Sequence, residues 1–213
     1  MSHAPHAPNA DSVSSAEAAA HEADATHARI RFRRHLAAQV TNVADLSWYL
    51  EQSLPGVAEP QVRLAVEELL DHLGRLMGFE VRRLADEDCA VWALDARPRL
   101  LVRLLDGAAA SARLSALVLA RDTLAAVGAL PSPHEVTCLA VVDDAGPERG
   151  PDEAMLLRRG LAQVRLVTVA ALVALGRACE GRGVSPADAV QLLQPAGAFA
   201  DRLIALVTRL ARD

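Results

Sequence analysis

The chain contains no lysine, and arginine supplies all 22 of its lysine-or-arginine residues over a length of 213. It therefore offers no lysine for Schiff-base chemistry and none to hold a nucleotide phosphate. Aromatic residues are almost as scarce, at 3%, while hydrophobic residues make up 52%. These proportions predict an aliphatic core of leucine, valine and alanine. The formal net charge of −5 argues against a nucleic-acid binder that uses its whole surface, and leaves only a local basic patch.

Cysteine is also too sparse to build a structural framework. Cys89, Cys138 and Cys179 are odd in number and far apart, which fits neither a set of disulfides nor a zinc site. We expect buried free thiols in a reducing compartment. No apolar run reaches transmembrane length without a charge or a break, and the N-terminus lacks the pattern of a signal peptide. These absences predict a soluble protein that stays in the cytoplasm and does not contact the membrane.

Four segments follow from the pattern along the chain. Residues 1–28 contain almost no large apolar side chain and are predicted to be a disordered tail, because they cannot bury enough surface to offset the entropy of ordering. Residues 29–56 are predicted to hold an N-terminal amphipathic helix, at about 32–53, which Pro55-Gly56 ends. Residues 57–183 form the expected α/β core domain, and residues 184–213 are expected to form C-terminal helices, the last at about 198–211.

The core domain alternates between helical and extended patterns. A helix is expected at about 60–77, followed by a short extended piece at 79–82. A hairpin is expected over 88–105, with strands at 89–94 and 99–105 and its turn at 95–98, because Pro98 suits a turn position. The remaining expected elements are a helix at 110–128, a strand at 136–142, a helix at 152–163, a short strand at 164–167, a helix at 169–180, and a helix start at Ser185-Pro186.

This order of elements resembles the restriction-endonuclease-like, or PD-(D/E)xK nuclease, fold. The stretch LLDHLGRLMGFEV, residues 69–81, is similar to the helix and first strand that open that fold. Asp88 stands near the place where the family's aspartate begins the hairpin, and QVRLVTVAALVAL, residues 163–175, is similar to its late strand-to-helix unit. The resemblance covers about 62–180. It implies a small mixed sheet flanked by helices, with extra N- and C-terminal helices in this chain.

The chain departs from this family at the third strand, which reads LLVRLLDG over residues 100–107. The acid-x-Lys triplet is absent, and Arg103 and Leu105 stand where its functional groups would point. The nuclease chemistry needs two carboxylates to hold Mg²⁺ and a cation near the attacking water. The resemblance therefore implies a catalytically inactive relative without a cofactor. In the alternative of an active nuclease, Glu68 and Asp88 would hold Mg²⁺ in a non-standard site.

A short basic run precedes the N-terminal helix and is the best candidate for binding nucleic acid or a partner. It consists of Arg29, Arg31, Arg33 and Arg34. Positive charge at a helix N-terminus opposes the helix dipole, which favours an anionic partner. The alternative is a solvated helix start whose side chains contact nothing. Because the chain as a whole is acidic, we favour an acidic protein over a long duplex as the partner.

Two residue pairs allow both a functional and a structural interpretation. Glu68 and His72 are four residues apart on a predicted helix, a spacing that suits acid–base work or a metal, and equally a surface pair. Trp48 and Tyr49 form the only adjacent aromatic pair, which either stacks on a base or packs against the core. Neither pair identifies a function by itself.

The hypothesis that these observations favour is a non-catalytic, nuclease-like scaffold. It would be an interaction subunit of a bacterial multi-protein system, with defence and nucleic-acid processing as the two settings considered. The alternatives are the metal-dependent nuclease described above and a homo-oligomeric structural protein. DNA cleavage with Mg²⁺ or Mn²⁺ separates the first two, and light scattering addresses the third.

Overall fold

The computed structural model describes residues 27–84, 88–105, 110–142, 164–181 and 183–194, together with Leu203, Ile204 and Val207. Over these residues the protein is α/β, with one open five-stranded sheet. The helices are a helix over residues 27–39, α2 (Val43–Ser53), the short 3₁₀ helix η1 (Leu54–Gly56), α3 (Pro60–Leu76), α4 (Ala110–Ala126), α6 (Val169–Glu180) and α7 (Pro186–Leu193). The strands are β1 (Glu80–Leu84), β2 (Cys89–Leu94), β3 (Arg97–Leu105), β4 (Thr137–Val142) and β5 (Val164–Thr168).

The sheet is mixed, and its strands lie in chain order from β1 to β5. The β1–β2 and β2–β3 pairs are antiparallel, whereas the β3–β4 and β4–β5 pairs are parallel. The last residues of β3 and β4, Leu105 and Val142, are directly paired. The carboxyl ends of β3, β4 and β5 therefore meet at one edge of the sheet.

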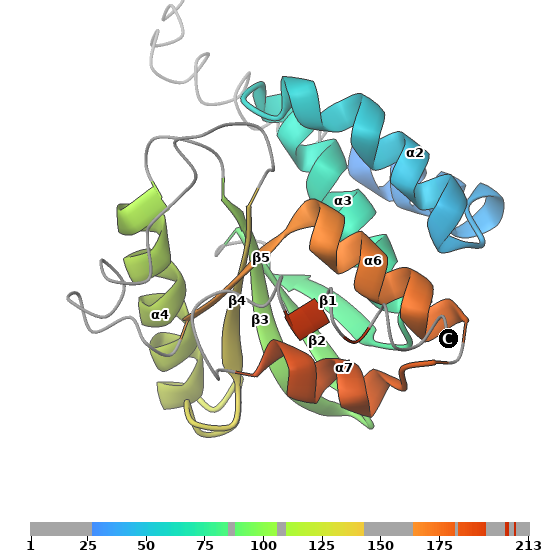
Figure 1. Cartoon of the computed structure of the whole chain (residues 1–213). Helices are drawn as coiled ribbons and strands as arrows, with labels where there is room; N and C mark the ends of the chain where they lie inside the picture. Colours follow the sequence, from blue (N-terminus) through green and yellow to red (C-terminus); the bar gives the residue numbers. More distant parts are fainter. Residues whose placement is uncertain are drawn as a thin grey trace, which may run out of the picture.

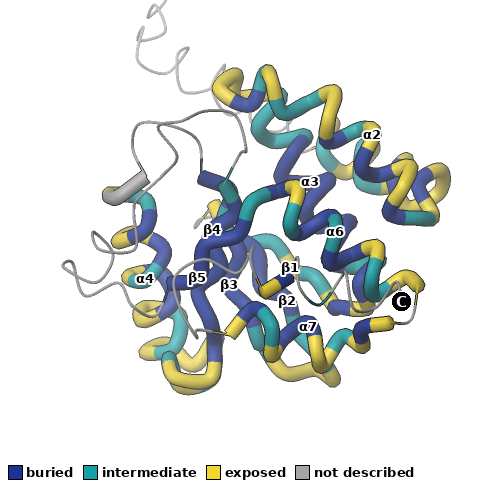
Figure 2. The backbone as a smooth tube through the Cα atoms, viewed as in Figure 1, coloured by how far each residue is buried: buried dark blue, intermediate teal, exposed yellow. Residues whose placement is uncertain are grey.

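Helices cover both faces of the sheet (Figure 1). Helix α4 lies on one face, while α3, α6 and α7 lie on the other, with α2 packed outside α3 and α6. The alternation of β3 explains the two layers, because Leu101 and Leu105 belong to the core under α4, and Leu100, Val102 and Leu104 to the larger core on the opposite face. Figure 2 shows the consequence, a set of central strands buried on both sides.

A close approach between α3 and the hairpin depends on a glycine. A Cβ atom on Gly74 would lie 2.8 Å from the Trp92 ring and 2.9 Å from the Val81 side chain. Trp92 is fully buried and packs against Phe79, with 5.5 Å between the ring centroids. Helix α3 is therefore held tightly over β1 and β2. Its position also determines which of its acidic side chains are buried.

The expectation of one amphipathic helix over 32–53 is wrong, because two helices occupy the segment 29–56. The first spans residues 27–39, and α2 begins at Val43 after the extended residue Asn42, with φ −142°. The Asn42 side chain accepts a hydrogen bond from the Asp45 backbone N–H at 2.8 Å, and the Glu180 carboxylate accepts one from the Val43 N–H at 3.2 Å. These caps compensate for the backbone bonds lost at the break, which apolar periodicity alone does not reveal.

The hairpin between β2 and β3 was predicted correctly, but its turn was placed too late. The two loop residues are Asp95 and Ala96, with φ of 51° and 59°. Positive φ at both central residues is the signature of a type I′ turn, whose twist matches that of the flanking strands. Pro98 lies within β3, paired with Ala93 where the register shifts, so its role in the turn was predicted wrongly.

Other expectations have mixed outcomes. The predicted start of α7 is confirmed by a capping box in which the Ser185 side chain accepts from Asp188 N–H. Cys89 and Cys138 are buried free thiols, while Cys179 is only half-buried. His27 and Ala28 are helical, although they were placed in the disordered tail. The rest of that tail, the helix expected at 152–163 and most of the helix expected at 198–211 lie outside the described residues. No helix within the described part of the chain is long and apolar enough to cross a membrane.

Candidate functional site

Helix α3 carries three buried acidic side chains, which we call the acidic row: Glu67, Glu68 and Asp71. Their residues are 2%, 0% and 1% exposed. The spacing would permit a surface location on an isolated helix, yet α3 is buried at every position from Val66 to Gly74. A buried carboxylate is costly unless it is paired and hydrogen-bonded. The acidic row therefore requires basic partners from elsewhere in the chain.

Arginines from two other segments and from α3 itself supply these partners. Glu68 accepts from Arg29 Nε at 3.1 Å and from Arg33 Nε and Nη2, both at 2.8 Å. Arg83 on β1 donates to both oxygens of Asp71, at 2.8 and 2.9 Å, and to Glu67 at 3.0 Å. Arg63 pairs with Glu67 one helical turn away, at 3.3 Å. The network ties the helix over residues 27–39 and strand β1 to α3.

The electrostatics of the acidic row differ from one member to the next. Burial raises the pKa of the Glu68 carboxyl, but the hydrogen bond and charge of Arg33, with the contribution of Arg29, more than offset it and hold the pKa below its usual value. Burial also raises the pKa of Asp71, and here the opposing effect of Arg83 does not fully compensate. Glu68 is thus held in its ionised form more firmly than Asp71.

The basic run predicted from the sequence is divided between two roles. Arg29 and Arg33 are half-buried and bound to Glu68, so they are not the solvated side chains expected of a helix start. Arg31 and Arg34 are exposed on the same helix. The 3.6-residue period explains this division, because Arg29 and Arg33 are four residues apart and share the inward side. Only Arg31 and Arg34 remain as outward-facing contact residues of the run.

The structure also shows where the two residue pairs with two interpretations lie, Glu68 with His72 and Trp48 with Tyr49. His72 donates from Nε2 to the Val40 carbonyl at 2.7 Å, since a carbonyl can only accept. It does so from a buried position, and the interpretation of Glu68 and His72 as a surface pair is therefore wrong. Trp48 is 56% exposed, whereas its edge-on neighbour Tyr49 is half-buried against the core. Packing accounts for Tyr49 but not for Trp48.

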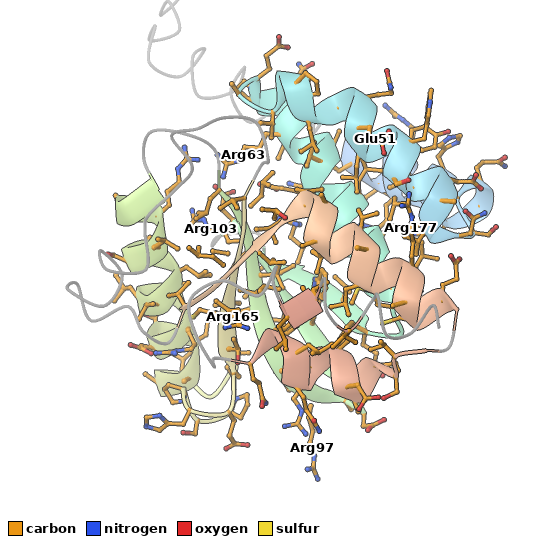
Figure 3. The ribbon with its side chains drawn as sticks, in the orientation of Figure 1. Glu51, Arg63, Arg97, Arg103, Arg165 and Arg177 are labelled. Carbon is orange, nitrogen blue, oxygen red and sulfur yellow. The ribbon has the colours of Figure 1, made fainter. Side chains whose placement is uncertain are left out.

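A second group of arginines, which we call the arginine cluster, lies near the carboxyl end of β3. It comprises Arg63 on α3, Arg103 on β3 and Arg113 in the first turn of α4. Arg103 shares the side of β3 that carries Leu101 and Leu105, and so faces α4. Its Nη2 lies 3.7 Å from an oxygen of Asp88, whose side chain is 58% exposed. Figure 3 labels Arg63 and Arg103 at the same end of the sheet.

The structure gives different partners to the two carboxylates proposed for a non-standard nuclease site. Glu68 is bound to Arg29 and Arg33, and Asp88 to Arg103. Among the described residues, no group of three histidine, cysteine or acidic side chains has a geometry that suits a metal ion. Each of the two carboxylates is therefore engaged in a separate ion pair, and no described contact brings them together.

The acidic row was not recognised as a unit from the sequence. Glu67 and Asp71 were overlooked, because charged residues on an amphipathic helix normally face solvent. Two signals pointed the other way: α3 itself carries apolar residues on several sides, and Arg33 precedes the helix while Arg83 follows it. No protein-family model, curated protein or solved structure matches this chain.

Proposed function

We propose that this protein is a non-catalytic interaction subunit built on a nuclease-like α/β scaffold. The observation that carries the proposal is the ion pair between Arg103 and Asp88. The resemblance to PD-(D/E)xK nucleases places metal-binding acids on these two strands. Here, β3 presents a guanidinium that faces Asp88, at the start of the hairpin. Such a pair provides neither the two carboxylates that Mg²⁺ requires nor a free base.

The arrangement of elements supports the scaffold part of the proposal. Helix α3 leads into the antiparallel strands β1, β2 and β3, and α4 then crosses to the parallel strand β4. Helices α3 and α4 cover opposite faces of the sheet. These elements belong to the order on which the resemblance was based.

The exposed arginines support the interaction part. Arg31 and Arg34 are exposed on a helix that Glu68 anchors to the core through Arg29 and Arg33, so the helix holds them in position. Guanidinium groups on a rigid element suit bidentate binding of carboxylates. We propose an acidic protein as the partner, within a bacterial multi-protein system that serves defence or nucleic-acid processing.

The partner prediction is tested with two double variants that remove equal charge. Arg31→Ala with Arg34→Ala should abolish salt-sensitive retention of the partner in a pull-down from the native host at about 0.1 M salt, where screening is incomplete. Arg82→Ala with Arg97→Ala removes two arginines that are exposed elsewhere, and should retain it. Unfolding midpoints should be unchanged in both, because neither pair has a buried partner.

Two outcomes would count against this assignment. Equal retention of the partner by both double variants would show that Arg31 and Arg34 do not contribute to binding. Tight DNA binding by the wild-type protein would favour nucleic acid, in particular if the slope of log affinity against log salt fell by about two in the Arg31/Arg34 variant, one unit for each lost phosphate contact.

A further inference from the structure

The arginine cluster brings three positive side chains together from three separate elements. Arg63 Nη2 donates to the Leu104 carbonyl at 3.4 Å, which places this side chain beside β3 next to Arg103. Burial lowers the pKa of Arg113, and the charges of Arg63 and Arg103 lower it further, against the opposing effect of Asp88. The three guanidiniums are thus close enough for their charges to act on one another, although Arg63 also pairs with Glu67.

The backbone adds positive potential at the same place. Helix α4 begins at Ala110 and has no acidic residue in its first turn, which instead contains Arg113. The N-terminus of a helix carries a partial positive charge and favours anions. Helix α4 is the next described element after β3. The carboxyl ends of β3, β4 and β5 meet at one edge of the sheet, where β3 ends. Ligands of open α/β sheets bind outside the carboxyl ends of the parallel strands.

Asp88 satisfies Arg103 only in part. A separation of 3.7 Å is an ion pair without a hydrogen bond. The Arg103 side chain is 13% exposed, and its buried Nε has no hydrogen-bond partner within the described part of the chain. Asp88 also adopts φ of 50°, in the left-handed region. The guanidinium of Arg103 therefore keeps donors available at the end of β3, beside a carboxylate that is open to solvent.

We propose that the arginine cluster binds the phosphoryl group of a small phosphorylated molecule, with Arg103 as its principal donor. A phosphoryl group accepts two parallel N–H bonds from one guanidinium and takes up the charge of its neighbours. The ligand enters past Asp88 and displaces its carboxylate from Arg103. This site is separate from the exposed arginines Arg31 and Arg34, so the proposal stands independently of the partner assigned above.

Isothermal titration of the full-length protein tests the site with three probes: pyrophosphate, ATP and adenosine. Pyrophosphate and ATP should bind and adenosine should not. Similar affinities for pyrophosphate and ATP would identify the phosphoryl group as the whole determinant. Much tighter binding of ATP would show that a nucleotide is the source of the phosphoryl group. Binding of adenosine as tight as that of ATP would overturn the proposal.

Two variants and one control assign the binding to the arginine cluster. Arg103→Met should weaken pyrophosphate binding by about tenfold or more, the usual effect of losing a charge-assisted hydrogen bond. Arg97→Met is the control, since Arg97 is exposed at the opposite end of the same strand (Figure 3). It should leave the affinity unchanged.

Asp88→Asn keeps the test decisive if Arg103→Met fails to fold. Asparagine tolerates the left-handed backbone at this position, and the change removes the carboxylate that competes for Arg103. Pyrophosphate binding should then tighten by about fivefold or more, because a repulsive charge a few ångströms away is lost. No binding by the wild type, or no gain in Asp88→Asn, would show that carboxylates of the chain itself neutralise the cluster, and would overturn the proposal.

Discussion

Replacing Glu68 with glutamine is expected to lower the free energy of unfolding by about 3–5 kcal/mol, the usual cost of removing one partner from a buried ion pair. Glu68 is fully buried and accepts hydrogen bonds from both Arg29 and Arg33. Glutamine keeps the size of the side chain but removes the negative charge that Arg29 and Arg33 share. The helix over residues 27–39 would lose its ion pairs with Glu68 and keep the one between Arg29 and Glu67, at 3.6 Å.

Urea unfolding of matched variants measures this effect. Glu51→Gln removes the same charge from an exposed position on α2 and should change stability by less than about 0.5 kcal/mol. The double variant Glu68→Gln with Arg33→Gln should be less destabilised than the sum of its single changes, because each single change already removes the ion pair that the two side chains share. Additive effects, or a Glu68→Gln variant as stable as Glu51→Gln, would contradict the role of the network.

The contribution of Glu68 should also depend on pH in a defined direction. Its pKa is lowered in the folded protein, so its stabilising effect is present above the unfolded-state pKa of about 4.3 and is lost as pH falls through the lower, folded-state value. The stability difference between wild type and Glu68→Gln should therefore be largest near neutral pH and shrink in acid. The pKa of Asp71 is raised in the folded protein, so its contribution to stability is present at low pH and is lost as pH rises through the folded-state value. This contribution is expected in the wild type and in Glu68→Gln alike.

Replacing Ile204 with alanine is expected to cost about 2–5 kcal/mol, the range for truncating a buried aliphatic side chain. Ile204 is 1% exposed and belongs to the core cluster that contains residues of α3 and α6. Val207 packs against the same cluster from three residues further along. Deletion of residues 198–213 removes both side chains, and should yield insoluble protein or a changed oligomeric state.

The neighbour of Ile204 provides the control for this prediction. Leu203 is 36% exposed, and Leu203→Ala should change the urea midpoint only slightly, because little apolar surface is uncovered. If Leu203→Ala were as damaging as Ile204→Ala, the two residues would be buried alike. If the 198–213 deletion left a soluble protein of unchanged stability, the segment would have no packed role.

Most strands and helices were predictable because the core alternates clearly. Strand β2 was predicted with both of its observed bounds, and β4 and β5 within one residue at either end, since each is a short apolar run bounded by turn or helix signals. Errors occurred where local interactions override apolar periodicity. Asn42 and Glu180 cap a break inside a continuous apolar pattern, and two residues with positive φ, neither of them glycine, form the hairpin turn.

The candidate site was predictable only in part. Arg103 was singled out only because the resemblance to the nuclease family implied an acid at its position, and it was not predicted to bind a ligand. The pairing of the basic run with the acidic row was not, because it joins residues 35 positions apart, such as Arg33 and Glu68. Pairing between charges that lie so far apart along the chain leaves no periodic pattern in the sequence that could reveal it. Only the packing of the helix over residues 27–39 against α3 reveals it.

Cleavage of DNA by the purified protein tests the central claim, that the scaffold is non-catalytic, most directly. Supercoiled plasmid and linear DNA are incubated with the full chain and Mg²⁺ or Mn²⁺, with Asp88→Ala in parallel. We expect no cleavage by either protein, because Asp88 faces Arg103 and Glu68 is bound to two arginines. Metal-dependent cleavage by the wild type that disappears in Asp88→Ala would contradict the account and establish the nuclease alternative.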